Sequence, residues 1–228
     1  MNAHHVSLAV VAGHPDGDGF ALKQGQFHGT AFCMAPDLFL TAAHVYRNAR
    51  EVEQVAVARF GPGRNHIQLV EEAELFEGID LAIMRVPGLK AEIRPLYFEP
   101  LNLLDEVFSL GYPFGFESHS STLYLRGFKG YIVTRRTLNM PDITEAPSGY
   151  EVSFIPPLGL SGAPLLSLID GGPCVVGMIL KHHVTNPGAE STMQLGLALD
   201  TEQLLTLESR IIGGSVAEIL FDRPQLRR

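Results

Sequence analysis

Short apolar runs, interrupted every few residues by glycine, proline or acidic side chains, dominate the hydrophobic pattern of this chain. Residues 29–35 and 38–41 are two such runs, separated only by Pro36-Asp37, and this arrangement is typical of a β-hairpin. The polar stretch 47–51 is predicted to be a loop, and residues 52–60 form the next predicted strand. The pattern therefore favours a fold made of many short strands.

The second half of the chain continues this pattern and adds one helical signal. Strands are predicted at residues 107–110, 123–125, 127–134, 164–169, 175–180 and 194–199. The polar segment 138–148 contains Pro141 and Pro147 and is the best candidate for a mobile loop. Asp200 is a good N-cap, and the leucines that follow it predict a helix ending before Gly213-Gly214.

Composition narrows the class of protein. The chain has 228 residues, 46% hydrophobic and 18% charged, with 23 glycines and 15 prolines, which suits a turn-rich globular β protein. Its net charge is −8 and no Lys/Arg run has interleaved aromatic residues, so nucleic-acid binding is not expected. No apolar run reaches 18 residues, so no membrane span is expected either.

Two cysteines, Cys33 and Cys174, lie within apolar runs that are predicted to be strands. A chain of this size does not need a disulfide for stability, so both are expected to be buried free thiols. No basic segment followed by a long apolar one is visible after Met1, so no secretory signal is expected. These observations favour a cytoplasmic protein.

Four acidic residues follow one another closely in the N-terminal half: Glu71, Glu72, Glu74 and Glu77. Most of them are expected to form a solvated face. Asp80 has a different setting, because it opens the apolar run 81–86, which contains no other acid. A carboxylate at the edge of a buried strand needs a partner, since burial otherwise raises its pKa until it is neutral.

His44 and Ser161 are the other candidates for chemistry. Ser161 lies in a glycine-flanked turn that exposes its hydroxyl, and His44 follows small residues that leave its imidazole accessible. Taken alone, each has an ordinary structural explanation, as a turn serine and a core histidine. Their order along the chain with Asp80 does not fit an α/β-hydrolase, in which the serine comes first, but it does fit the triad of the two-barrel proteases.

Metal and cofactor sites are not expected. The glycine- and aspartate-rich segment 13–19 is predicted to be a turn or loop, because it lacks the terminal glutamate of a calcium-binding loop. His182-His183 has no third ligand at metal spacing.

Three motifs in this order resemble the chymotrypsin-like (trypsin-fold) serine proteases: Thr41-Ala42-Ala43-His44, Asp80-Leu81-Ala82-Ile83 and Gly159-Leu160-Ser161-Gly162-Ala163-Pro164. Further segments look like the bacterial heat-shock protease branch of that family: residues 29–32, 111–113 and 175–178. The resemblance covers roughly residues 6–212. It implies an all-β fold of two six-stranded antiparallel barrels with a C-terminal helix. The expected divisions are 1–90 with His44 and Asp80, 91–199 with Ser161, and 200–228 as helix and tail.

The resemblance also implies roles for individual residues. Ser161 would be the nucleophile, His44 the general base and then acid, and Asp80 the group that orients the imidazole. Backbone N–H groups of Gly159 and Ser161 would form the oxyanion hole. Leu160 and Val45 depart from the extracellular members, which carry an acid before the serine and a cysteine after the histidine. Activation by cleavage near the N-terminus is therefore not expected.

Substrate preference is expected to depend on the segments on either side of the nucleophile. Ile155, Leu158, Ile179 and Leu180 are predicted to line the first specificity pocket, which holds no carboxylate to select Lys or Arg. A small or medium apolar residue is predicted at the cleavage point. The alternative is an acidic residue, which the segment Lys181-His182-His183 would favour.

The expected function is hydrolysis of peptide bonds in protein or peptide substrates through an acyl-enzyme, gated by the loop 138–148 or by a regulatory protein partner. The alternative is a catalytically silent binding or assembly module on the same fold.

Overall fold

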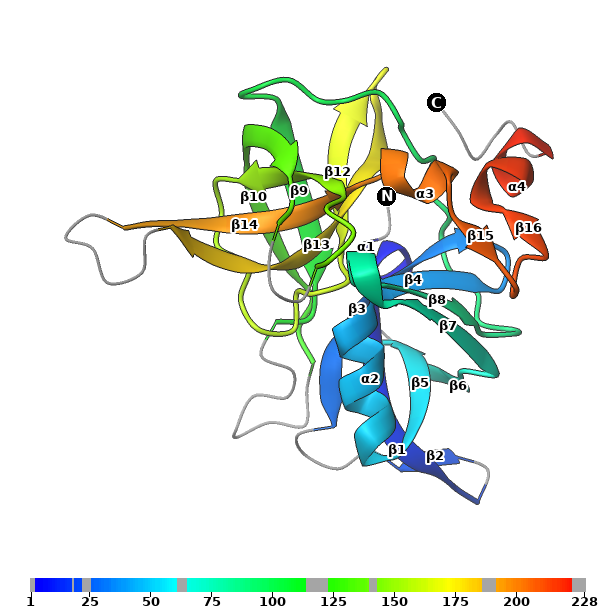
Figure 1. Ribbon diagram of the computed structural model, residues 1–228. Helices are drawn as coiled ribbons and strands as arrows, with labels where there is room; N and C mark the ends of the chain where they lie inside the picture. The colour runs from blue at the N-terminus through cyan, green and yellow to red at the C-terminus, as the bar shows by residue number, and fades with distance from the viewer. Residues whose placement is uncertain are drawn as a thin grey trace.

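The computed structural model describes residues 3–17, 19–21, 26–60, 65–113, 123–139, 143–185 and 192–222. Two antiparallel β-sheets, one from each half of the chain, make up most of this part of the protein (Figure 1). The all-β class predicted from the alternation of short apolar runs and turn residues is confirmed.

The N-terminal sheet is a half-barrel of eight strands, in contrast to the six-stranded barrel that was expected. Its strands are β1 (Leu8–Asp16), β2 (Gly19–Ala21), β3 (Phe27–Ala35), β4 (Leu38–Ala42), β5 (Gln54–Arg59), β6 (His66–Leu69), β7 (Glu72–Phe76) and β8 (Leu81–Arg85). The main path runs β6-β5-β1-β3-β4-β8-β7, and β2 pairs with β1. Strands β6 and β7 lie at opposite ends of this order, yet they follow one another directly in the chain, so the sheet must curl strongly. The connection between them is hydrogen-bonded to both sides: Val70 N–H donates to Val55 O (2.9 Å) and Glu71 N–H donates to Arg85 O (3.0 Å).

The C-terminal sheet is a closed barrel of six strands, as expected, in the order β10-β11-β14-β13-β12-β9. These strands are β9 (Glu106–Gly111), β10 (Arg126–Thr137), β11 (Ser148–Val152), β12 (Pro164–Ile169), β13 (Gly172–Thr185) and β14 (Met193–Asp200). Strands β13 and β14 continue together beyond the barrel as a ribbon that projects away from both sheets (Figure 1).

A helix replaces the loop predicted at residues 47–51. Helix α2 (Ala43–Val52) forms because Val45 and Ala49, one turn apart, are buried, while the polar residues between them face solvent. The prediction was wrong because the polar residues were taken as a break in the pattern, although no glycine or proline interrupts it. The segment predicted as loop at residues 13–19 is also more regular, since β1 runs to Asp16 and pairs with β2.

The C-terminal helix is shorter than predicted and is followed by further structure. Helix α3 (Glu202–Leu205) has a single turn, and the side chain of Asp200 accepts a hydrogen bond from Glu202 N–H at its start (3.0 Å). The chain then forms the small strands β15 (Glu208–Ser209) and β16 (Gly214–Ser215) and the helix α4 (Val216–Asp222). A short helix α1 (Ala3–Val6) begins the described chain.

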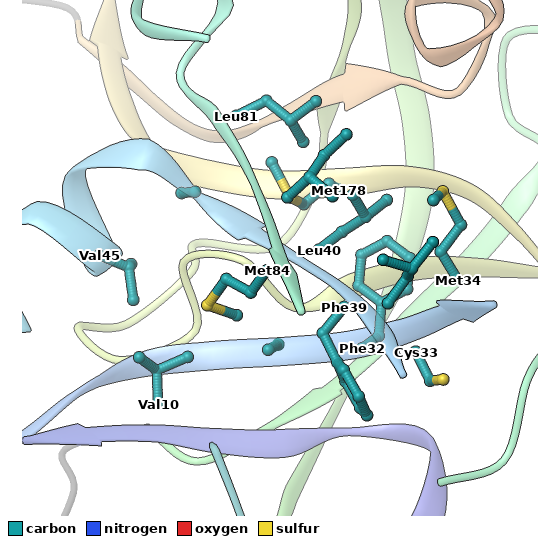
Figure 2. Close-up of a cluster of buried hydrophobic side chains, with 14 of the residues drawn as sticks. Val10, Phe32, Cys33, Met34, Phe39, Leu40, Val45, Leu81, Met84 and Met178 are labelled. Carbon is teal, nitrogen blue, oxygen red and sulfur yellow. The ribbon is translucent and has the colours of Figure 1, made fainter. Parts of the chain in front are cut away.

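The largest hydrophobic core is shared by the two halves. Phe32, Leu40 and Leu81 of the N-terminal sheet belong to the same buried cluster as Met178 and Leu199 of the barrel. Figure 2 shows Met178, on β13, against Leu40 and Leu81. Because burial of apolar surface at this boundary stabilises both sheets, their relative position is set by packing rather than by the connecting segment alone.

Both cysteines are free and buried, as predicted. Burial raises the pKa of the Cys33 thiol to about 12, so this thiol stays protonated and unreactive at neutral pH. None of the helices in the described part of the chain has the length and apolar character that crossing a membrane requires.

Glu74 of β7 fastens the C-terminal segment to the N-terminal sheet, and it does not belong to the solvated face that was predicted. Its carboxylate accepts hydrogen bonds from the Ser209 hydroxyl (2.7 Å) and from the N–H groups of Arg210 (2.8 Å) and Ile211 (3.4 Å). Although burial alone would raise the pKa of Glu74, these bonds and the Arg210 guanidinium lower it below its usual value. The ionised carboxylate therefore stabilises the folded chain.

Replacing Glu74 with Gln is expected to lower the free energy of unfolding at pH 7 by about 2 kcal/mol, because hydrogen bonds to a charged group are lost. The stabilisation by Glu74 is fully present above its ordinary pKa of 4.5 and disappears as the pH falls through the lower folded-state value. Wild type and Glu74→Gln should therefore converge at low pH in chemical denaturation. Glu72→Gln, at an exposed position, is the control; a constant difference at all pH values would contradict the assignment.

Candidate active site

His44 lies in the first turn of α2, directly after β4. The residues that precede it, Thr41, Ala42 and Ala43, are fully buried in the wall of the sheet. The His44 side chain itself keeps 32% of its surface exposed. The fold therefore holds the backbone of His44 rigidly while its imidazole reaches the surface.

Asp80 meets His44 because β8 pairs with β4. The register places Ala42 opposite Leu81, and Ala43 N–H donates to Asp80 O (3.2 Å). The carboxylate is 7% exposed; its Oδ1 accepts a hydrogen bond from His44 N–H (3.0 Å) and its Oδ2 lies 2.8 Å from His44 Nδ1. A carboxylate only accepts hydrogen bonds, so Nδ1 carries the proton and Nε2 presents a lone pair.

The turn that carries Ser161 packs against the β3–β4 hairpin. Thr30 N–H donates to Ser161 O (2.9 Å), and the Thr30 hydroxyl donates to Gly159 O (2.9 Å). At Gly162, where φ is +82°, an added Cβ would collide with Thr30 O and lie 3.0 Å from Ala42 N. Ser161 is thus brought beside the strand end that leads into His44, from a position 117 residues away in the sequence (161 − 44).

Hydrogen bonds alternate along this turn, so that two N–H donors have no acceptor in the part of the chain that the structure describes. Leu160 N–H donates to Pro157 O (3.1 Å), Gly162 N–H to Ile179 O (2.8 Å) and Ala163 N–H to Leu160 O (3.0 Å). The N–H groups of Gly159 and Ser161 make no hydrogen bond to any described residue. Two such donors, separated by one residue, suit an anionic oxygen.

Leu160 anchors the turn. Its side chain is fully buried in the barrel core, and an added Cβ at Gly111 would lie 2.7 Å from Leu160 Cδ1. Gly159 has φ of +92°, a conformation that glycine adopts without strain. Hydrophobic burial of Leu160 therefore orders this turn.

The four residues predicted to contact substrate fall into two groups. Ile155 is 49% exposed and Leu158 is 79% exposed, whereas Ile179 and Leu180 are fully buried. Ile179 packs inside the barrel and Leu180 in the shared core. A ligand can therefore reach only the first two side chains directly.

Sequence reasoning missed the role of Thr30. Its hydroxyl also accepts a hydrogen bond from Tyr112 N–H (3.3 Å), so one fully buried side chain joins β3, the Ser161 turn and the segment after β9. A polar residue within an otherwise apolar strand was the available signal. Among the described residues, no group of three or more His, Cys, Asp or Glu side chains is placed to hold a metal ion.

A family model described as a trypsin-like peptidase domain matches residues 29–178, a range that includes His44, Asp80 and Ser161. Comparison with the curated proteins finds no match.

Solved structures similar to this chain include the Rv3671c protease from M. tuberculosis in its active form. That match has 23% sequence identity and a TM-score of 0.62, and it covers 96% of this chain and 81% of the other. The HtrA-type protease AlgW, solved with a decapeptide, is 18% identical with a TM-score of 0.60, over 88% of this chain and 62% of the other. At these identities the likeness concerns the fold, and it agrees with the fold expected from the sequence.

Proposed function

The chain belongs to the trypsin-like peptidase domain family and is a serine endopeptidase, and we propose that His44, Asp80 and Ser161 are its catalytic triad. The observation that carries the proposal is the 2.8 Å contact between Asp80 Oδ2 and His44 Nδ1, formed next to the strand end against which the Ser161 turn packs. Its chemistry follows from the proton positions that this contact imposes.

In the first half of the reaction, Ser161 Oγ attacks the carbonyl carbon of the scissile peptide while His44 Nε2 takes its proton. The oxygen that becomes negative is stabilised by the N–H groups of Gly159 and Ser161. His44 then returns the proton to the departing amine, leaving the acyl group on Ser161. A water molecule, deprotonated by His44, then attacks the acyl carbon. The bond to Ser161 Oγ breaks, His44 returns the proton to that oxygen, and the acid product leaves.

The N–H groups of Gly159 and Ser161, which donate to no described residue, support an oxyanion hole that is already formed before substrate binds. Removing one such donor typically raises the barrier by about 2.7–4 kcal/mol, so their preorganisation is a major part of the expected rate. Control by the loop 138–148 or by a regulatory protein partner remains part of the proposal. Residues 140–142 of that loop lie outside the described residues, whereas Leu138 and Ile143 are buried.

Protein or peptide segments in an extended conformation fit the edge of β13. Strand β12 pairs with β13 only as far as Met178, so the continuation of β13 beyond the Ser161 turn has an edge that β12 does not cover. A peptide can add to such an edge through main-chain hydrogen bonds. Ile155 and Leu158 are the apolar side chains accessible at this site.

The test combines an active-site probe with substrate profiling. A fluorophosphonate probe should modify the wild-type protein at Ser161, and a peptide library should be cut after small or medium apolar residues. A clear preference for Lys or Arg, or for acidic residues, would contradict the specificity. If Ser161 is never labelled, alone or with candidate partners, the triad assignment fails and the silent binding or assembly module becomes the better description.

We place the protease in a reducing compartment, the cytoplasm, because both thiols are free. Titration of the denatured, unreduced protein should find two thiols, and finding none would argue against this location.

A further inference from the structure

A three-residue turn leads directly into Asp80. This 3₁₀ turn, η1 (Glu77–Ile79), ends at Asp80, whose N–H donates to Glu77 O (3.3 Å). Asp80 itself is held at φ +55° and ψ +46°, a left-handed conformation that only a minority of non-glycine residues adopt. Such a conformation persists only where the surrounding structure holds it, so the contacts of η1 affect the position of the carboxylate.

One of those contacts comes from the other half of the molecule. Glu145, between β10 and β11 of the C-terminal barrel, donates its N–H to Gly78 O (3.0 Å). The Glu145 side chain also lies directly over the α-carbon of Gly78: an added Cβ there would collide with its Cγ, Cδ and Oε1. The contact therefore involves both the backbone and the side chain of Glu145.

The segment that presents Glu145 has buried contacts on both sides of it. Ile143 is 1% exposed and lies in the same buried cluster as Ile79 of η1. Leu138 N–H donates to Pro147 O (2.8 Å), which closes the segment at its base. Glu145 thus lies between the buried residues Ile143 and Pro147 of the barrel loop and touches the turn next to Asp80.

We propose that Glu145 is a positioning residue for Asp80, an inference that rests on the proposed function. Ser161 belongs to the barrel, whereas His44 and Asp80 belong to the N-terminal sheet, so their alignment depends on contacts between the two. Thr30 makes that connection at the nucleophile, through its bonds to Ser161 O and Gly159 O. The contact of Glu145 with Gly78 makes the corresponding connection beside Asp80. This contact keeps η1 from moving away from His44.

A double-mutant cycle tests this role, because a methyl group added at Gly78 would collide with the side chain of Glu145, which a second substitution can remove. Gly78 does not have a positive φ, so an alanine there fits the backbone, and the three atoms nearest to its methyl group all belong to the Glu145 side chain. Gly78→Ala should displace Glu145 and lower the rate of fluorophosphonate labelling about tenfold, below the roughly hundredfold that a 1 Å misplacement can cause. Glu145→Ala should lower it about twofold. The double variant should return to the level of Glu145→Ala, because the atoms that collide with the new methyl group are absent.

A spectroscopic measurement separates positioning from general stability. The proton between His44 Nδ1 and Asp80 gives a downfield NMR signal, which should shift or broaden in Gly78→Ala and recover in the double variant. Thermal unfolding of all four proteins shows whether they are equally folded. If Gly78→Ala does not fold, the NMR signal of Glu145→Ala carries the test, since Glu145 is exposed and its truncation leaves the core intact.

Two results would overturn the inference: a Gly78→Ala variant with the wild-type labelling rate and NMR signal, or a double variant whose loss is the product of the two single losses. A wild-type protein that the probe never labels would instead refute the proposed function. In that case the NMR signal still reports whether Glu145 positions Asp80, so the two failures are distinguishable.

Discussion

Replacing Ser161 with alanine is expected to lower kcat for peptide hydrolysis by about 10⁶-fold, the largest effect of any single change in this protein. The variant keeps the His44–Asp80 pair and the two free N–H groups, but it has no atom that can form the acyl-enzyme. The hydroxyl makes no hydrogen bond to the described residues, so its removal should leave the fold intact. Steady-state hydrolysis of a peptide identified by library profiling measures the loss.

Ser167→Ala is the matched control for this change. Ser167 lies six residues further along, on β12, where its hydroxyl donates to Glu106 O (2.9 Å). Its removal should cost about 1 kcal/mol of stability and leave kcat unchanged. Activity in Ser161→Ala within tenfold of wild type would show that the nucleophile is another residue.

Replacing Asp80 with asparagine is expected to lower kcat by about 10⁴-fold. In the wild type, one carboxylate oxygen accepts from His44 N–H (3.0 Å) and the other faces Nδ1 (2.8 Å). An asparagine oxygen can replace only one of these acceptors, so the amide NH₂ then faces Nδ1. That arrangement favours the imidazole tautomer with the proton on Nε2, which cannot accept the proton of Ser161.

Asp37→Asn controls for the backbone conformation at Asp80. Asp37 also has a positive φ, +62°, and its carboxylate accepts a hydrogen bond from Gly88 N–H (3.1 Å), but it lies in the exposed turn between β3 and β4. Its variant should keep wild-type kinetics. Measurement of kcat and KM separately for Asp80→Asn should show the loss in kcat, and a loss confined to KM would refute the orienting role.

The residue types required for this chemistry were predictable because they belong to short motifs. A histidine after three small residues, an acid opening an apolar strand and a serine between glycines are local features of the sequence. The closed six-stranded barrel agrees with what the resemblance implied. Apolar runs and turn residues marked five of its strands, but they missed β11 (Ser148–Val152), and residues 123–125 are not one of its strands. Helix α2 was missed because its polar stretch looks like a loop until Val45 and Ala49 are seen to be buried on one side.

Other features had no local signal. Glu74 sits among solvated acids in the sequence, and only the return of the C-terminal segment explains its hydrogen bonds and its lowered pKa. Ile179 and Leu180 were expected to contact substrate because residues 178–180 were predicted to form one wall of the specificity pocket. Their burial in two different cores became apparent only in the folded chain.

The sequence by itself determined which side chains can carry out peptide hydrolysis and in which order they occur, since that depends on residue chemistry and local turn propensity. The tertiary structure decided what those side chains face. It aligned Asp80 with His44 through the β4–β8 register, left the N–H groups of Gly159 and Ser161 without an acceptor among the described residues, and placed Glu145 against Gly78. The directions of backbone donors and the contacts between distant segments follow from packing, which no local stretch of sequence encodes.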